Sequence, residues 1–129
     1  MTTIDHLSLG VADVPAARVF YSRVLDIFGI RCLAEGDGFA TFGRDHIAFL
    51  LLTPFDGGPA SAGNGAHVAF AAPDHEAVAR AHAAGLDAGA IDEGAPGVRA
   101  ADPMPAVFAA YLRDPSGNKI ELVHGGYSA

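Results

Sequence analysis

A repeat with a period of 61 residues is the feature of this chain that most constrains its fold. Residues 4–11, around His6, alternate between two faces as a β-strand does, and the short apolar segment of residues 66–71, around His67, also indicates a strand. These histidines are 61 residues apart, and so are Asp13 and Asp74, the aspartates that follow them. Aspartate is a preferred residue at the start of a helix. The spacing therefore predicts two copies of one module, each beginning with a strand and then a helix.

Three more strands are predicted in each copy. In the first copy, a helix runs from Asp13 to a stop at Gly29, and the strands cover residues 31–34, 39–43 and 46–53. In the second copy, a helix covers residues 74–84 and stops at Gly85, and the strands cover residues 88–92, 107–113 and 119–124. The glycines and prolines between residues 92 and 105 predict a loop there, either a lid or a simple connection. The order βαβββ thus occurs twice, which predicts an α+β fold.

The length of 129 residues suits one domain. We expect residues 1–129 to form it, with a first module over about residues 1–53 and a second over about residues 66–129. Residues 54–65 are rich in Pro, Gly, Ser and Asn, and are predicted to be the linker.

Composition excludes several classes of function. Half of the residues are apolar and 18% are charged, which favours a compact core over disorder. The net charge of −7 makes a nucleic-acid or anionic-membrane partner unfavourable. No apolar run is long enough for a membrane span, and the first residues lack a basic-then-apolar signal. The single cysteine, Cys32, excludes an internal disulfide and fits a reducing, cytoplasmic setting. We interpret it as a small buried residue, not a nucleophile.

A third residue joins the two repeated histidines. Glu121 lies in an otherwise apolar strand, where an unpaired carboxylate would be costly to bury. With His6 and His67 it makes a set of two histidines and one carboxylate, which suits a divalent metal with open positions for a substrate. A histidine in a strand is more often an ordinary core or surface residue, and we read the remaining four that way: His46, His75, His82 and His124.

The duplicated module, the histidine at the start of each copy and the ending Asp-Pro-Ser-Gly-Asn-Lys-Ile-Glu resemble the vicinal oxygen chelate superfamily, which includes glyoxalases, bleomycin resistance proteins and extradiol dioxygenases. The resemblance covers essentially the whole chain. It implies that the modules form a curved sheet around a cleft that holds a divalent Fe, Mn, Zn or Ni ion. In such a site the metal binds neighbouring oxygens of the substrate and acts as a Lewis acid.

The resemblance does not single out one branch. Glyoxalase I has a fourth ligand in the last strand of the first module, and residues 47–52 contain no side chain that could bind a metal. Tyr111 and the Asp-Pro-x-Gly that follows it are similar to the extradiol signature, but the histidine upstream of that tyrosine is missing. Ser8 could take the place of a hydroxyl kept by fosfomycin-modifying enzymes, although the basic residues expected after Glu121 are absent.

The first hypothesis is therefore a metal-dependent enzyme, a lyase or a dioxygenase, that acts on a small oxygenated organic molecule. Its metal ligands would be His6, His67 and Glu121, with Glu121 and Tyr111 as catalytic residues. The expected substrate-contacting and pocket-lining residues are Ser8, Phe49, Leu51, Ala69 and Phe108.

Two other hypotheses remain open. One is a small-molecule binding or sequestration protein of the bleomycin-resistance type, without catalysis. The other is a protein with a purely structural metal. The resemblance also implies a homodimer, and it leaves open whether the metal set forms within one chain or between two chains.

Overall fold

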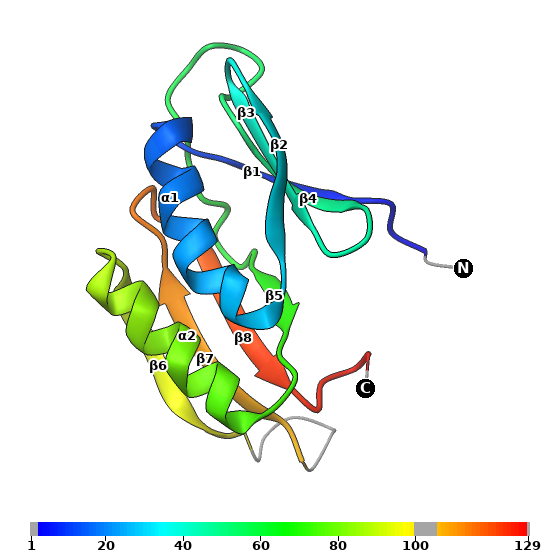
Figure 1. Ribbon diagram of the computed structural model, residues 1–129. Helices are drawn as coiled ribbons and strands as arrows, with labels where there is room; N and C mark the ends of the chain where they lie inside the picture. The colour runs from blue at the N-terminus through cyan, green and yellow to red at the C-terminus, as the bar shows by residue number, and fades with distance from the viewer. Residues whose placement is uncertain (1–2, 100–105, 129) are drawn as a thin grey trace.

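The computed structural model describes residues 3–99 and 106–128 (Figure 1). Within them, eight strands form two four-stranded sheets, with strand orders β1-β4-β3-β2 and β5-β8-β7-β6. The first module consists of β1 (Leu7–Gly10), α1 (Val14–Leu25), the short 3-10 helix η1 (Asp26–Phe28), β2 (Arg31–Gly36), β3 (Phe39–Gly43) and β4 (Ile47–Leu52). The second consists of β5 (Val68–Ala71), α2 (His75–Asp87), β6 (Ile91–Val98), β7 (Phe108–Arg113) and β8 (Lys119–His124). The predicted double βαβββ order is confirmed.

The two helices begin in the same way. The carboxylate of Asp13 accepts a hydrogen bond of 3.0 Å from the backbone N–H of Ala16, and that of Asp74 accepts one of 2.7 Å from Ala77. Each bond satisfies a backbone donor that has no partner within the helix. The repeated aspartates are therefore helix N-caps, as their spacing predicts.

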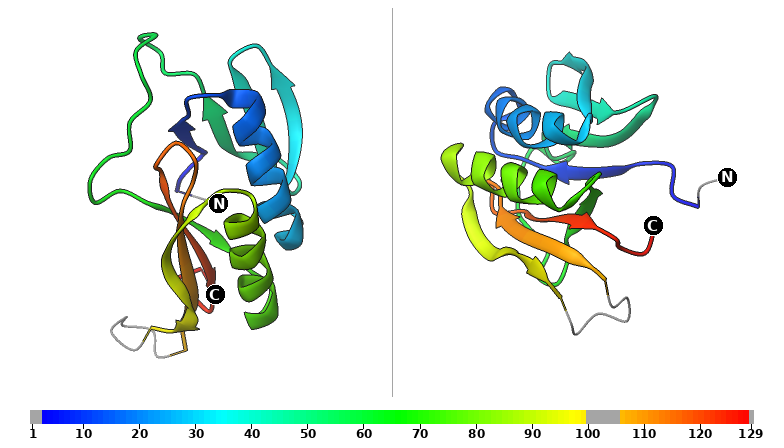
Figure 2. Two further views of the ribbon diagram at one scale, coloured as in Figure 1. Left: turned by 90° about the vertical axis from the view of Figure 1, so that its left-hand side faces the viewer. Right: turned by 60° about the horizontal axis from the view of Figure 1, so that its bottom comes forward.

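The helices pack side by side, and each lies against one face of its own sheet (Figures 1 and 2). The hydrophobic core fills the space between the helices and these sheet faces. Its largest fully buried side chains are Tyr21, Phe42, Leu25, Leu51, Leu112, Ile120 and Leu122. The two sheets do not close into one barrel, so the face of each sheet that points away from the helices stays open.

Helix α2 does not stop at Gly85, as its glycine had indicated, but continues to Asp87. Gly85 is buried, and a Cβ atom there would overlap the side chain of Leu112 on β7. This glycine therefore lets the helix approach the sheet closely. The chain turns instead at Gly89, whose φ of +103° is a conformation that other residues rarely adopt.

Strand β6 occupies residues 92–98, the first half of the segment that the sequence predicts as a loop. It pairs with β7 through two irregularities of register, and Pro96 falls between the paired residues Gly94 and Gly97. A proline at a bulge of an edge strand interrupts no ladder hydrogen bond, which is why the strand tolerates it. Residues 100–105 of the predicted loop lie outside the described residues.

The predicted tight turn between β7 and β8, residues 114–118, connects the second module to the first. The side-chain amide of Asn118 donates a 2.9 Å hydrogen bond to the carbonyl of Gly10, and the hydroxyl of Ser116 accepts one of 3.0 Å from the N–H of Ala12. Gly117 has a φ of +91°, the left-handed conformation that this turn needs. The turn thus helps to fix the end of β1 relative to β8.

Neither helix among the described residues is long and apolar enough to cross a membrane.

Candidate functional site

The site begins with an imidazole and a carboxylate in the second module. His67 directly precedes β5, and Glu121 lies in the middle of β8, paired with Ala69 of β5 on one side. The Nε2 atom of His67 is 3.0 Å from Oε1 of Glu121. Because side chains alternate along a strand and Ile120 and Leu122 point into the core, Glu121 points to the open face of the sheet.

Burial distinguishes the two partners. The side chain of Glu121 is only 12% exposed, whereas that of His67 is 42% exposed. A buried carboxylate requires a partner, and His67 provides it in the described structure. Which nitrogen of the ring carries the proton depends on the tautomer.

Tyr111 completes the group on this face. It pairs directly with Glu121 across β7 and β8, and its ring centroid is 6.1 Å from that of His67. The three side chains line a cavity of about 390 Å³. The other lining residues are Ala69, Ala71, Val107, Val123, Gly126, Tyr127 and Ser128.

The residues after β8 also line the cavity, and they were not predicted from the sequence. Gly126, Tyr127 and Ser128 turn back over the open face and form one wall of the cavity. Their only sequence signal is position, because they come shortly after the strand that carries Glu121.

His6 is not part of this group. It precedes β1 in the first module, just as His67 precedes β5, and its side chain is 52% exposed. Its Nδ1 atom is 2.7 Å from a carboxylate oxygen of Asp5, its neighbour in the chain. Over residues 3–99 and 106–128, no three histidine, cysteine, aspartate or glutamate side chains lie close enough to hold one metal ion.

The predicted lining residues of the first module divide between the two faces of its sheet. Ser8 is exposed and pairs with Leu50 of β4, and paired residues point to the same face of a sheet. Phe49 and Leu51 point to the other face, where they are buried in the core, with the ring of Phe49 5.3 Å from that of Tyr21. The β4 residues that share the face of Ser8 are therefore Ala48, Leu50 and Leu52 instead.

The same alternation places the two predicted lining residues of the second module, Ala69 and Phe108, on opposite faces of their sheet. Ala69 lies on the open face and lines the cavity beside His67. Phe108 points to the helix side, where its ring stacks on that of His75 with centroids 4.1 Å apart. Both residues were expected to line the pocket, because a strand of mostly apolar residues carries no alternating signal that would separate its two faces.

The pair formed by His67 and Glu121 has the donor chemistry of a divalent metal site. A neutral imidazole nitrogen and a carboxylate oxygen both bind ions such as Zn, Mn, Fe or Ni. Two protein ligands are fewer than such sites generally use, and the repeat equivalent of His67 lies on the other module. The residues of one chain therefore fit a metal in part, and a third protein ligand would have to come from elsewhere.

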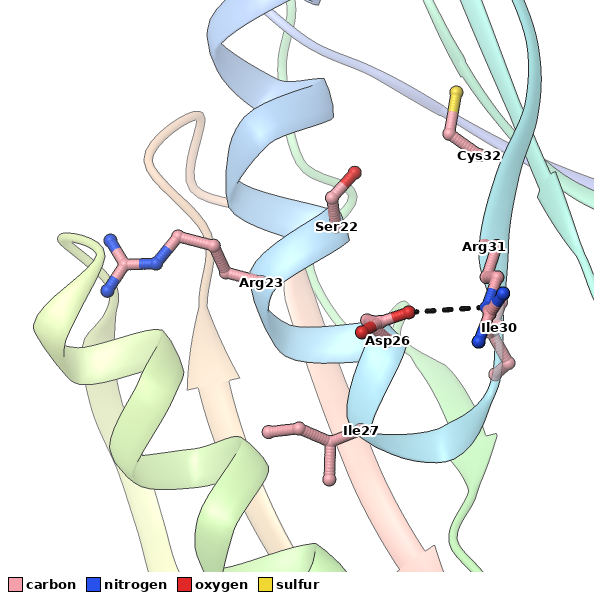
Figure 3. Close-up of a pocket in the computed structure, with 7 residues that line it drawn as sticks. All are labelled: Ser22, Arg23, Asp26, Ile27, Ile30, Arg31 and Cys32. Carbon is pink, nitrogen blue, oxygen red and sulfur yellow. Dashed lines mark ion pairs between the residues drawn. The ribbon is translucent and has the colours of Figure 1, made fainter.

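A larger hollow, of about 650 Å³, lies between the end of α1 and the start of β2 in the first module (Figure 3). Across it, Arg31 forms an ion pair of 3.4 Å with Asp26, and both side chains are mostly exposed. Cys32 also lines this hollow, partly buried, with its thiol 3.6 Å from the carbonyl of Ala34. None of the predicted site residues lies there.

The family of the chain follows from comparison with known proteins. The sequence model of the Glyoxalase/Bleomycin resistance protein/Dioxygenase superfamily matches residues 3–122. The chain belongs to this superfamily. The resemblance noted in the sequence, to the vicinal oxygen chelate proteins, is thereby confirmed, together with the fold that it implies.

Solved structures of this superfamily match nearly the whole chain. A glyoxalase/bleomycin resistance protein from Albidiferax ferrireducens T118 is 34% identical, with a TM-score of 0.86 over 95% of this chain and 98% of the other. A possible glyoxalase from Bacillus cereus is 27% identical, with a TM-score of 0.66 over 95% and 98%. A family member from Burkholderia phytofirmans PsJN, 16% identical with a TM-score of 0.72 over 95% and 98%, shares the fold. No curated protein matches the sequence.

Proposed function

We propose that this superfamily member is a metal-dependent enzyme that acts on a small organic molecule with neighbouring oxygen atoms. The observation that carries the proposal is the contact of His67 Nε2 with the buried carboxylate of Glu121, at 3.0 Å on the open face of the sheet. A buried carboxylate beside an imidazole, at the wall of a cavity of about 390 Å³, has the chemistry and the space that a metal and a small substrate need.

The third ligand in this proposal is His6 of a second copy of the chain. His6 and His67 hold equivalent positions in the two modules, yet the packing of α1 against α2 leaves their sheets open and His6 half-exposed. A homodimer that sets the first module of one copy against the second module of the other would supply the missing imidazole to each site. It would also cover the apolar open face that carries Leu50 and Leu52.

A bound divalent metal would supply Lewis acidity toward the substrate oxygens. The chain's own groups would do the rest. Glu121 and His67 would hold the metal at the wall of the cavity, and so fix where the substrate oxygens bind. Tyr111 faces the same space from the neighbouring strand, where its hydroxyl can orient an oxygen of the substrate. Ser8 lies on the open face of the first module, in a position to contact the substrate from the other copy.

Metal content of the purified protein tests the proposal. We expect wild-type protein, dialysed against Zn, Mn, Fe or Ni and then washed, to retain about one ion per chain, and the His67→Ala and Glu121→Gln variants to retain at least tenfold less. His46→Ala is the matched control, since His46 is an exposed histidine outside the site. Equal metal retention by His67→Ala and wild type would refute the site.

A mixing experiment tests the contribution of the second copy. His6→Ala and His67→Ala protein are unfolded together and refolded as a mixture. If each site spans two chains, a mixed dimer has one intact site and one doubly damaged site, so about a quarter of all sites regain metal. If the site lies within one chain, the mixture binds no more metal than the separate variants do.

The alternative function, binding or sequestration of a small molecule without catalysis, gives a different result. Such a protein would bind organic ligands in the cavity whether or not metal is present, and the Glu121→Gln variant would bind them as wild type does. We expect instead that a panel of catechols, glutathione hemithioacetals and epoxides reveals turnover only after metal loading.

A further inference from the structure

Two cationic side chains lie against the ring of Tyr111. The guanidinium of Arg99 is 5.6 Å from the ring centroid, and the ammonium of Lys119 is 5.1 Å from it. Both residues are partly buried. Lys119 is two positions before Glu121 on β8 and therefore points to the same open face.

These two cations differ from most others of the chain in how they are paired. Four arginines form ion pairs with carboxylates: Arg18 with Glu35, Arg23 with Asp87, Arg31 with Asp26 and Arg113 with Glu93. Within the part of the chain that the structure describes, neither Arg99 nor Lys119 has a carboxylate within 4.0 Å. In a chain with a net charge of −7, two such cations at one ring concentrate positive charge in one place.

Arg99 lies over two glycines of β6, Gly94 and Gly97. Its guanidinium donates a 2.7 Å hydrogen bond to the carbonyl of Ala95. A Cβ atom added at Gly94 would come within 3.2 Å of one terminal nitrogen of Arg99, and one added at Gly97 within 3.2 Å of the other. The two glycines therefore leave the space along which Arg99 reaches Tyr111.

Tyr111 thus has His67, Glu121 and two cations as neighbours. The rings of His67 and Tyr111 are 6.1 Å apart, so the imidazole, the phenol and both cations lie around one small area of the open face. The remaining charged groups here are Arg113 and Glu93, which neutralise each other at 2.7 Å, and the carboxylate of Glu121. A metal on Glu121 would leave Arg99 and Lys119 as uncompensated positive charge.

We propose that Arg99 and Lys119 form an anion-binding subsite beside Tyr111, and that the substrate carries a carboxylate in addition to its neighbouring oxygens. The inference rests on the proposed function for the position of the reacting oxygens. It deepens that function by naming the substrate class: small oxygenated carboxylates. Arg99 and Lys119 are binding residues in this proposal and take no part in the chemistry.

The test compares two probes that differ in one group. 2,3-Dihydroxybenzoate has neighbouring hydroxyls and a carboxylate, and catechol has the hydroxyls alone. We expect metal-free wild-type protein, titrated by NMR, to bind 2,3-dihydroxybenzoate about fivefold more tightly than catechol, a ratio typical of a half-exposed charge pair. The ratio should fall to about one when salt screens the charges at about 1 M.

The Arg99→Gln and Lys119→Gln variants should each lower this ratio at least twofold without changing the affinity for catechol. The control is Arg80→Gln. Arg80 is an exposed arginine of α2, which covers the face of the sheet opposite to that of Tyr111, so this change should leave the ratio unchanged. Gly97→Ala keeps every charge and requires the guanidinium of Arg99 to shift only slightly, so it should lower the ratio less than Arg99→Gln does. Unfolding midpoints of all four variants show whether each is folded.

A wild-type ratio near one, or a ratio that Arg99→Gln and Lys119→Gln leave unchanged, would overturn the subsite. Because these titrations use metal-free protein, their outcome is separate from that of the metal-retention experiment. A protein that binds no metal but prefers the carboxylate would contradict the proposed enzyme and support the subsite.

Discussion

The hydroxyl of Tyr21 donates a 2.6 Å hydrogen bond to the carboxylate of Asp114, and both residues are buried. The two are 93 positions apart: Tyr21 lies on α1 of the first module and Asp114 at the turn between β7 and β8 of the second. Asp114 also accepts hydrogen bonds from the backbone of Ser116 and Asn118. One carboxylate thus organises a turn of one module and fixes a helix of the other.

Replacing Tyr21 by phenylalanine should destabilise the protein by about 1–3 kcal/mol, because the buried carboxylate loses a donor. Denaturant unfolding measures this loss. Tyr127→Phe is the control, since Tyr127 is 78% exposed and its change should cost less than about 0.5 kcal/mol. A Tyr21→Phe variant as stable as wild type would show that the bond does not hold the modules together.

The same residue should make the protein sensitive to high pH. Burial and the charge of Asp114 raise the pKa of Tyr21 well above 10.0. The folded state therefore keeps a proton that the unfolded state releases, and stability is lost as the pH rises above 10.0 toward the higher folded pKa. We expect the free energy of unfolding of wild type to fall more steeply above pH 10 than that of Tyr21→Phe.

Acid should weaken a second contact, between His82 of α2 and Asp92 of β6. The N–H of Gly94 and the ring of His82, which lies 3.0 Å away, hold the pKa of Asp92 below its usual 3.8. A lowered carboxyl pKa contributes stability that is present above the unfolded pKa and is lost as the pH falls through the folded pKa. Asp92→Asn should therefore flatten the decline of stability below about pH 4, measured by unfolding at a series of pH values.

Asp37→Asn, in the exposed turn before β3, provides the charge-matched control for that series. It should leave the shape of the acid limb as in wild type. If both variants change the limb equally, the effect comes from net charge and not from the contacts of Asp92.

The turn between β3 and β4 should not tolerate a side chain at Gly43. A Cβ atom there would overlap the backbone carbonyl of His46, which cannot move aside without breaking the hairpin. Gly43→Ala should cost about 3 kcal/mol in the free energy of unfolding. In the control Gly63→Ala, the added atom would meet only Ala66, at an ordinary 3.4 Å, and the cost should stay below about 1 kcal/mol.

Metal binding should raise the stability of the folded protein. An ion that binds the native site but not the unfolded chain stabilises by about 2.7 kcal/mol at a hundredfold excess over its Kd. We expect Zn or Mn to raise the unfolding midpoint of wild type and a chelator to reverse the rise. Glu121→Gln should show neither effect, and a similar rise in both proteins would mean that the ions bind somewhere else.

Local chemistry was readable in the sequence. The 61-residue spacing predicted the repeated order of elements, which the structure has. The N-caps Asp13 and Asp74 and the turn of residues 114–118 depend only on neighbours in the chain, and they too have the predicted structure. The pairing of His67 with Glu121 was also part of the predicted set, because a repeated histidine and a carboxylate in an apolar strand leave few other partners.

Other features depended on contacts between distant segments. Gly85 resembles a helix stop in the sequence, but the approach of Leu112 from β7 makes it an interior residue of α2. Similarly, the glycines of β6 predict a loop, but they lie in a strand that pairs with β7 and leave room for the side chain of Arg99. Only tertiary packing shows whether a glycine ends an element or makes room for a neighbour.

The sequence by itself determined the module, its duplication and the residues able to bind a metal, because these follow from periodicity and from the chemistry of single side chains. The tertiary structure decided which of those residues meet. The pairing of β5 and β7 with β8 keeps His67, Glu121 and Tyr111 together on one sheet, and His6 lies beside the other sheet. It also sends Phe49 and Leu51 to the core, since the face of a strand is set by which side the helix covers.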